Sequence, residues 1–301
     1  MTEFLQQLIN GLALGSIIAL IALGYTMVYG ILRFINFAHG DIFMLGAFAG
    51  YYLAPKIALL LPLPSIAGGL VVLVASMLIC ATLGVLIERL AYRPLRKRPK
   101  LTVLITAIGM SLFLEYAGQF FFGASIRKFP DIFPVTTVTR IGGLSLNSNQ
   151  LMVLGVTLVL LVALRFIVMR TRIGTAMRAV AFNPEAAALM GVNTDVVISF
   201  TFALGSALAA AGGILWAINY PAIDPLMGIL PGLKAFIAAV LGGIGNLPGA
   251  ALGGLVIGVV ETFVKGTRWS TWADAISFAI LILILLVKPS GLLGKKEIEK
   301  V

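Results

Sequence analysis

Side chains that bind metals or form disulfides are scarce in this sequence. Among 301 residues there is one cysteine and one histidine. A single cysteine excludes a disulfide scaffold and a cysteine-based zinc site, and a single histidine cannot form a histidine cluster. We therefore expect no metal centre.

Charge is scarce as well. Charged residues make up 11% of the chain and hydrophobic residues 60%, whereas soluble domains have about 25% charged and about 45–50% apolar residues. A water-soluble fold of this composition would lack the polar surface needed to cover it. The sequence therefore indicates a membrane protein.

A phosphate-binding loop is also missing. No G-x-x-x-x-G-K-[ST] pattern occurs in the chain, so it does not cradle ATP in the usual way. We expect no cofactor.

Long apolar runs dominate what is present, and each approaches the ~20 residues that a membrane span requires. The runs are continuously apolar rather than alternating, which argues against a β-barrel. We predict an all-α polytopic membrane protein with a single transmembrane domain over residues 1–301 and about eight transmembrane helices. They are expected near 8–32, 42–61, 65–88, 101–122, 150–169, 195–219, 247–264 and 273–288, with a short helix near 232–243.

Basic residues mark one side of the membrane. Fourteen of the 22 lie in three short segments: 89–100, 165–178 and 288–300. Cytoplasmic loops carry such an excess, so we place these segments in the cytoplasm and the N-terminus outside. The net charge of +10 thus reflects topology, and no nucleic-acid partner is expected.

A break in the last third keeps this topology consistent. Three unbroken crossings after residue 178 would place the basic C-terminus outside. Gly242, Gly243, Gly245 and Asn246, followed by Pro248, cannot continue a helix. We predict a broken, re-entrant helix pair near 232–264 that enters and leaves on the outer side, and we count these four residues as candidates for a pore or gate.

Glycine is abundant, with 33 residues, and pairs spaced by four recur, as in Gly11/Gly15 and Gly254/Gly258. Such pairs let helix backbones approach closely in lipid. They indicate tight packing within the bundle or, alternatively, contact with a second subunit. The sequence Leu14-Gly15-Ser16 also recurs as Leu204-Gly205-Ser206, as in transporters built from two related halves.

Two further places put polar groups among apolar residues. Asn36, His39 and Asp41 lie in RFINFAHGDIF, either as a gate or pore-lining break or as a cytoplasmic turn in which Asp41 caps the next helix. Glu115 falls within the expected helix 101–122. It is either a proton or substrate site or a group solvated near the interface.

The segment 170–194 is too regular for a linker. Asn183 can cap a short helix that has Pro184 in its first turn and Glu185 near its positive end. Ala186 and Ala187 follow. A final glycine, Gly191, can end this helix. A short helix exposed to the cytosol can dock in a groove of a partner protein.

These residues carry a family resemblance. Glu185-Ala186-Ala187, with Gly191 six residues after the glutamate, resembles the front half of the EAA motif of ATP-binding-cassette permeases, whose coupling helix docks into the ATPase. The later Ile-x-Leu-Pro of that motif is not present, because residues 201–204 read TFAL. We assign Glu185, Ala186, Ala187, Gly191 and Arg178 to this coupling surface.

A wider match covers nearly the whole chain. The stretches GYTMVYGILRFINFAHGDIFMLGAF, IERLAYRPLRKRP, TAIGMSLFLE, RTRIGTAMRAVAFNPEAAALMGVN, KAFIAAVLGGIGNLPGAALGG and KPSGLLGKKEIEKV resemble the branched-chain amino acid permeases, H type. The resemblance implies import of leucine, isoleucine and valine across the bacterial inner membrane. It also implies an M-type permease partner, two cytoplasmic ATPases and a periplasmic binding protein.

Other functions stay open at this point. Permeases for urea or short amides would share this pattern. A self-powered channel or ion-coupled transporter would need a buried acidic relay, for which Glu115 alone is a candidate. An intramembrane enzyme would need paired catalytic groups, and His39 has no such partner in the sequence.

Overall fold

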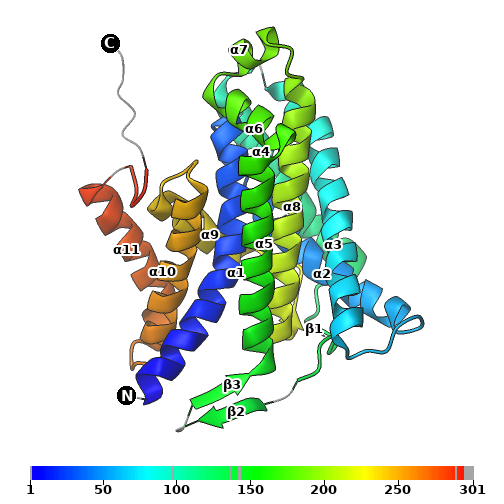
Figure 1. Ribbon diagram of the computed structural model, residues 1–301, viewed down its shortest axis with the longest axis vertical. Coiled ribbons are helices and arrows are strands. Elements are labelled where there is room, and N and C mark those ends of the chain that lie inside the picture. The colour runs from blue at the N-terminus through cyan, green and yellow to red at the C-terminus, as the bar shows by residue number, and fades with distance from the viewer. Residues whose placement is uncertain (1, 97, 136, 142–143, 289, 295–301) are drawn as a thin grey trace.

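The computed structural model describes residues 2–96, 98–135, 137–141, 144–288 and 290–294. Its helices run side by side along the long axis of the molecule (Figure 1). The predicted all-helical architecture is confirmed. The basic residues Lys97, Lys295, Lys296 and Lys300 lie outside the described residues.

Six helices of the described chain are long and apolar enough to cross a membrane. In this count α3 runs on through two short helices, η1 and η2, to Leu95. The six spans comprise α1 (Thr2–Leu32), α3 (Ile66–Ile87) with η1 (Glu88–Tyr92) and η2 (Arg93–Leu95), α4 (Lys100–Phe122), α5 (Ser148–Arg170), α8 (Thr194–Asn219) and α10 (Leu247–Lys265).

Shorter elements complete the fold. The further helices are α2 (His39–Ile57), α6 (Arg172–Phe182), α7 (Pro184–Leu189), α9 (Ile229–Gly242), η3 (Ser270–Trp272) and α11 (Ala273–Val287). Strand β1 (Arg127–Lys128) pairs antiparallel with β4 (Ala222–Ile223), and β2 (Thr137–Ile141) with β3 (Leu144–Asn147).

The two ends of the bundle differ in charge and in content. One, the basic end, carries η1, η2, α6 and α7, and an Arg96–Asp195 ion pair joins η2 to the start of α8 there. The opposite end carries the N-terminus and the β2–β3 hairpin (Figure 1), and the Ser145 backbone N–H donates to Gln6 there. Residues predicted to be cytoplasmic and residues predicted to be outside therefore lie at different ends.

Helix α1 is the centre of the bundle, because 94% of its apolar window is buried inside the protein. Small residues bring α10 against it: an added Cβ on Gly15 would lie 2.7 Å from the Cα of Leu255, and one on Gly254 would lie 2.5 Å from the Cα of Ala19. Gly11 meets Val259 in the same way. These glycines pack within the chain, as the first of the two interpretations states.

Helices α2 and α9 begin inside the bundle rather than at its ends. His39, the first residue of α2, is 1% exposed. The Nε2 atom of His39 lies 3.2 Å from the carbonyl oxygen of Ile21. At the helical rise per residue, Ile21 lies about 16 Å from the C-terminal end of α1. Gly228, just before α9, contacts Gly40. A Cβ added to Gly40 would lie 2.8 Å from the carbonyl oxygen of Gly228. Residues 33–38 and 220–228 thus enter the bundle without helical structure.

The starts of α2 and α9 occupy equivalent places in two series of elements that have the same order. Helix α1, the segment 33–38, α2 and α3 follow one another as do α8, the segment 220–228, α9 and α10. The two series run in opposite directions, since α2 leads to the opposite end and α9 to the basic end. Inverted repeats of this kind are common in transporters. The recurrence of Leu-Gly-Ser in α1 and α8 falls on corresponding helices.

The break predicted near 232–264 is observed between two helices, but it lies at the basic end of the bundle and not at mid-membrane depth, and α10 is itself long enough to span a membrane. Helix α9 ends at Gly242, α10 begins at Leu247, and Gly243 and Gly245 have φ angles of 101° and 90°. The break lies near Gly30, at the basic end of α1, and α10 then runs to Lys265 beside the N-terminal residues at the opposite end. An added Cβ on Gly266 would lie 2.9 Å from Gln7 Nε2.

The fold predicts that a side chain at Gly15 breaks the α1–α10 contact. Overpacking of a tight site costs about 1–3 kcal/mol, so Gly15→Val should unfold at a lower temperature. The matched change Gly155→Val, on α5, meets nothing within 4 Å of an added Cβ and should leave the midpoint unchanged. Cys80 is the one cysteine and is buried, so its reaction with a thiol dye during heating reports unfolding. Equal midpoints for both variants would contradict the packing.

Candidate functional site

Helix α7 projects from the basic end as the tip of the molecule (Figure 1). Asn183 Oδ1 accepts the backbone N–H of Ala186 at 3.0 Å, which caps the helix as predicted. Gly191 follows with a φ of 84°. Around this helix the side chains of Phe182, Leu189 and Met190 are 84–89% exposed.

A second helix, α6, supports α7 and was not predicted. Thr171 Oγ1 caps it by accepting the N–H of Gly174 at 3.1 Å. Arg178, on α6, donates to the carbonyl oxygen of Val168 in α5 and to Met169 Sδ. Arg178 therefore ties α6 to the end of α5. Glu185 and Ala186 are exposed, and Ala187 is buried against the protein.

The polar residues between α1 and α2 are buried. Asn36, His39 and Asp41 are at most 2% exposed, so the alternative of a solvated cytoplasmic turn is wrong. Helix α2 begins at His39 after Ala38, whose side chain makes no cap, and the Asp41 carboxylate does not cap it. The rings of His39 and Tyr25 meet edge to face at 4.7 Å between centroids.

Asp41 instead contacts α4. Ser111 Oγ donates to Asp41 Oδ2 at 2.5 Å. Glu115 lies four residues further along α4, and its charge interacts with that of Asp41. Its side chain is half-buried, and no ion-pair partner is found for it in the described chain. The structure thus brings Asp41, Ser111 and Glu115 together on the α2–α4 face.

The glycine-rich break between α9 and α10 does not contribute to the α2–α4 face. Asn246 Oδ1 caps α10 through the N–H of Gly249 at 3.1 Å, and Asn246 Nδ2 donates to Leu293 O at 2.7 Å. The backbone N–H of Leu292 donates to Leu241 O. Gly242, Gly243 and Asn246 thus contact residues 290–294 near the C-terminus, whereas Gly245 lies near Gly30 on α1.

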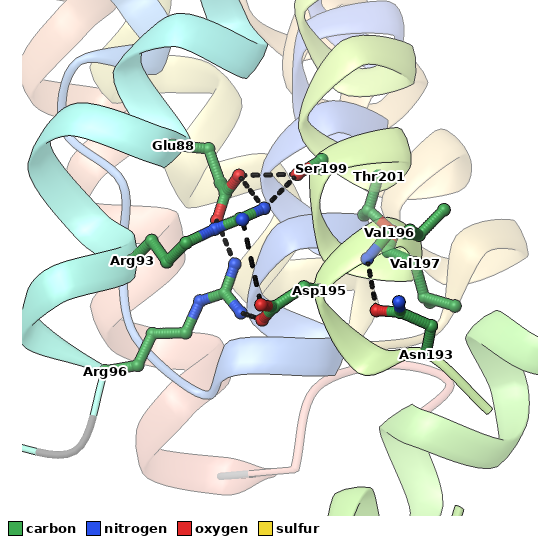
Figure 2. A network of polar contacts seen from close by, with 9 residues as sticks. All are labelled: Glu88, Arg93, Arg96, Asn193, Asp195, Val196, Val197, Ser199 and Thr201. Carbon is green, nitrogen blue, oxygen red and sulfur yellow. Dashed lines mark hydrogen bonds and ion pairs between the residues drawn. The ribbon is translucent and has the colours of Figure 1, made fainter. Parts of the chain in front are cut away.

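A network of charges at the basic end was missed by the sequence analysis (Figure 2). Glu88 is 0% exposed, although a glutamate at a helix end reads as interfacial. It pairs with Arg93 at 3.3 Å and with Arg96, and Ser199 Oγ donates to it at 2.6 Å. Asp195 Oδ1 pairs with Arg96 at 2.6 Å. Only the spacing of Glu88 to the two arginines signals this cluster, and its partners on α8 lie more than 100 residues away.

A second buried network was not predicted from the sequence either. Lys234 Nζ on α9 pairs with Glu261 Oε1 at 2.8 Å and with Asp274 Oδ1 at 2.6 Å. Lys265 reaches the same Glu261 oxygen at 2.6 Å, one turn away on α10. These pairs join α9, α10 and α11 without a solvated loop.

Comparison with known proteins identifies the family. Residues 7–285 match the model described as branched-chain amino acid transport system / permease component. The chain is 43% identical to LivH of Escherichia coli K12, a high-affinity branched-chain amino acid transport system permease protein, over 99% of this chain and 98% of LivH. The chain belongs to this permease family.

Other relatives agree with this permease assignment. BraD of Pseudomonas aeruginosa, another high-affinity branched-chain amino acid transport system permease protein, is 41% identical over 99% of this chain and 98% of its own length. The inner membrane ABC transporter permease protein YjfF of Escherichia coli is 27% identical over 63% of this chain and 62% of its length. The permease is thus a multi-pass protein of the inner membrane and part of a multi-subunit ABC system, as the motifs predict.

The contribution of the buried Lys234 to stability can be tested against that of the exposed Lys265. Breaking a buried ion pair by removing one partner costs about 3–5 kcal/mol, whereas an exposed pair contributes about 0–1 kcal/mol. The Lys234 side chain is 7% exposed and that of Lys265 is 48% exposed, although both bind the same oxygen of Glu261. Lys234→Met should therefore lower the unfolding midpoint strongly and Lys265→Met barely. The Cys80 dye assay measures both, and equal shifts would contradict the assignment.

Proposed function

We propose that this chain is the H-type permease subunit of an ATP-binding-cassette importer for leucine, isoleucine and valine. In this proposal it works with an M-type permease, two cytoplasmic ATPase subunits and a periplasmic binding protein. The basic end faces the cytoplasm, since basic loops do so in membrane proteins. The observation that carries the proposal is the exposed helix α7 at this end of a chain from the permease family.

The shape of α7 supports docking into an ATPase. Exposed side chains as large as Phe182, Leu189 and Met190 cannot lie free in water without cost, and a partner groove would bury them. Arg178 holds the segment on α5, so α7 is presented from a fixed base. A push or pull on α7 would then be felt by the bundle.

The α2–α4 face supports a substrate path. Lipid does not tolerate a half-buried carboxylate without a cation at mid-helix, so the surface beside Glu115 faces a cavity or another protein. Helix α4 is the least buried and the least hydrophobic of the six long spans, the reverse of what lipid contact requires. We assign this face to a path shared with the second permease, where Asp41 and Glu115 attract the ammonium group of an amino acid.

Reconstituted transport tests the function. The chain is purified with the subunits that assemble with it and placed in liposomes with ATP and the binding protein. Uptake of labelled leucine should require ATP, and unlabelled valine and isoleucine should compete with it. Competition by urea or acetamide, with no effect of valine, would reassign the substrate. Uptake driven by an ion gradient without ATP would overturn the importer assignment.

The coupling surface gives a prediction. Glu185→Ala removes an exposed charge from α7, and Gly191→Leu places a branched side chain at a φ of 84°. In a coupling helix, both should lower uptake per ATP hydrolysed about fivefold or more. Membrane insertion should stay normal in both variants, and thermal stability should stay normal in Glu185→Ala, which introduces no backbone strain. The control Glu3→Ala removes an exposed carboxylate from the opposite end, and unchanged uptake in all three variants would refute this role.

The acidic face gives a second prediction. Glu115→Gln keeps the shape of the side chain and removes its charge, so the substrate ammonium group loses an attraction. We expect uptake to fall about tenfold at low substrate concentration, the equivalent of ~1.4 kcal/mol. The control Asp131→Asn removes an exposed charge elsewhere. An uptake rate in Glu115→Gln equal to that of the control would remove Glu115 from the path.

A further inference from the structure

The coupling helix and α8 are joined by a short, fully hydrogen-bonded elbow. Only residues 190–193 separate α7 from α8. The N–H of Val192 donates to Ala187 O at 3.0 Å. Asn193 Oδ1 then caps α8 by accepting the N–H of Val196 at 3.2 Å. A displacement of α7 is therefore passed to the first turn of α8.

The first two turns of α8 are in turn tied to the segment between α3 and α4 (Figure 2). Asp195 binds Arg96 at 2.6 Å, and Ser199 binds Glu88 at 2.6 Å and Arg93 at 2.9 Å. Glu88 accepts from three side chains and is fully buried. Buried charges of this kind hold their partners in one arrangement.

The same short helix, η1, carries the next contact. It is a π-helix over Glu88–Tyr92, a form found frequently at functional sites. Tyr92 is 0% exposed, and its hydroxyl donates to Asn36 Oδ1 at 2.6 Å. Asn36 belongs to the segment 33–38 that enters the bundle, and its carbonyl accepts the N–H of His39, the start of α2.

The side chain of Asn36 is only partly satisfied. Its Nδ2 group is buried and has no hydrogen-bond partner among the described residues. An unpaired buried donor is costly. Tyr92 is thus the one side-chain partner found for Asn36 in the described part of the chain, and the bond between them ties the segment 33–38 to η1.

We propose that Glu88 and Tyr92 are positioning residues that transmit movement of α7 to the segment 33–38, and through it to the start of α2. The path runs from the elbow at 190–193 through Asp195 and Ser199 to the η1–η2 segment, and from Tyr92 to Asn36. The inference rests on the proposed function, because it assumes that α7 is moved by an ATPase. It names the residues through which this motion reaches the α2–α4 face.

Removal of one oxygen atom tests the link. Tyr92→Phe keeps the buried ring and deletes its bond to Asn36. In the reconstituted complex, leucine uptake per ATP hydrolysed should fall about fivefold or more, while ATP hydrolysis stays near that of the unchanged protein. The unfolding midpoint should fall, because the buried Asn36 Oδ1 loses its partner, but a loss of stability alone lowers uptake and ATP hydrolysis together. Asn36→Ala should give the same loss, and the double variant should be no worse than either single change.

The control is Tyr51→Phe, on α2 near the opposite end, where Tyr51 packs against Arg127. It should leave uptake per ATP unchanged. The link is overturned if Tyr92→Phe behaves like Tyr51→Phe or if the two losses multiply in the double variant. Failure of the proposed function is a distinct result, because the unchanged complex would then show no ATP-dependent uptake.

Covalent rescue provides a second test that does not depend on Tyr92. In a Cys80→Ser background, Arg96→Cys with Asp195→Cys removes the ion pair between η2 and α8. Uptake per ATP should fall, and joining the two thiols with a short bismaleimide should restore it, because the link needs rigidity rather than charge. No recovery after complete cross-linking would show that these segments must move apart, which contradicts the proposal.

Discussion

The backbone contact between Gly40 and Gly228 is the constraint on which the rest of the fold depends. It lets two helices, α2 and α9, start side by side inside an apolar bundle, where their preceding segments 33–38 and 220–228 are not helical. Non-helical backbone at such depth is tolerated only where protein or a water-filled cavity surrounds it. Side chains such as Tyr25, His39 and Asn36 therefore fill this region and satisfy part of its polar surface.

Charge placement follows the same rule at both ends of the bundle. Glu88 at the basic end and Glu261 on α10 are both 0% exposed, and each is held by two basic side chains. These clusters cross-link η1 with the distant α8, and α9 with α10 and α11. Glu115 on the α2–α4 face and Glu185 on α7 have no ion-pair partner among the described residues. The proposed substrate path and the proposed ATPase contact lie at these two carboxylates.

Sequence patterns predict the local features of this protein well. Asn183 and Pro184 begin α7, and residues 242–246 interrupt the helix between α9 and α10. Glycines spaced by four mark the packing of α1 against α10. The basic segments and the membrane class follow from composition alone. In each case the signal lies within a few neighbouring residues, which is why it can be read without a structure.

What could not be predicted depends on contacts between distant residues. The burial of Glu88 requires Ser199, and that of Asp41 requires Ser111, 70 residues away. When almost every helix face is apolar, periodicity does not show which face turns inward. The segment 33–38 carries a local signal, polar residues among apolar ones, but that pattern fits a gate as well as a turn, and only the burial of Asn36 and His39 decides between them.

The central claim is that ATPase movement at α7 reaches the segment 33–38. The most direct measurement is the rate at which a thiol reagent labels Ile35→Cys in a Cys80→Ser background, in the assembled complex with and without a non-hydrolysable ATP analogue. The account predicts a change in rate of about fivefold or more on nucleotide binding, and none when the ATPase subunits are absent. Equal rates with and without nucleotide in the full complex would contradict it.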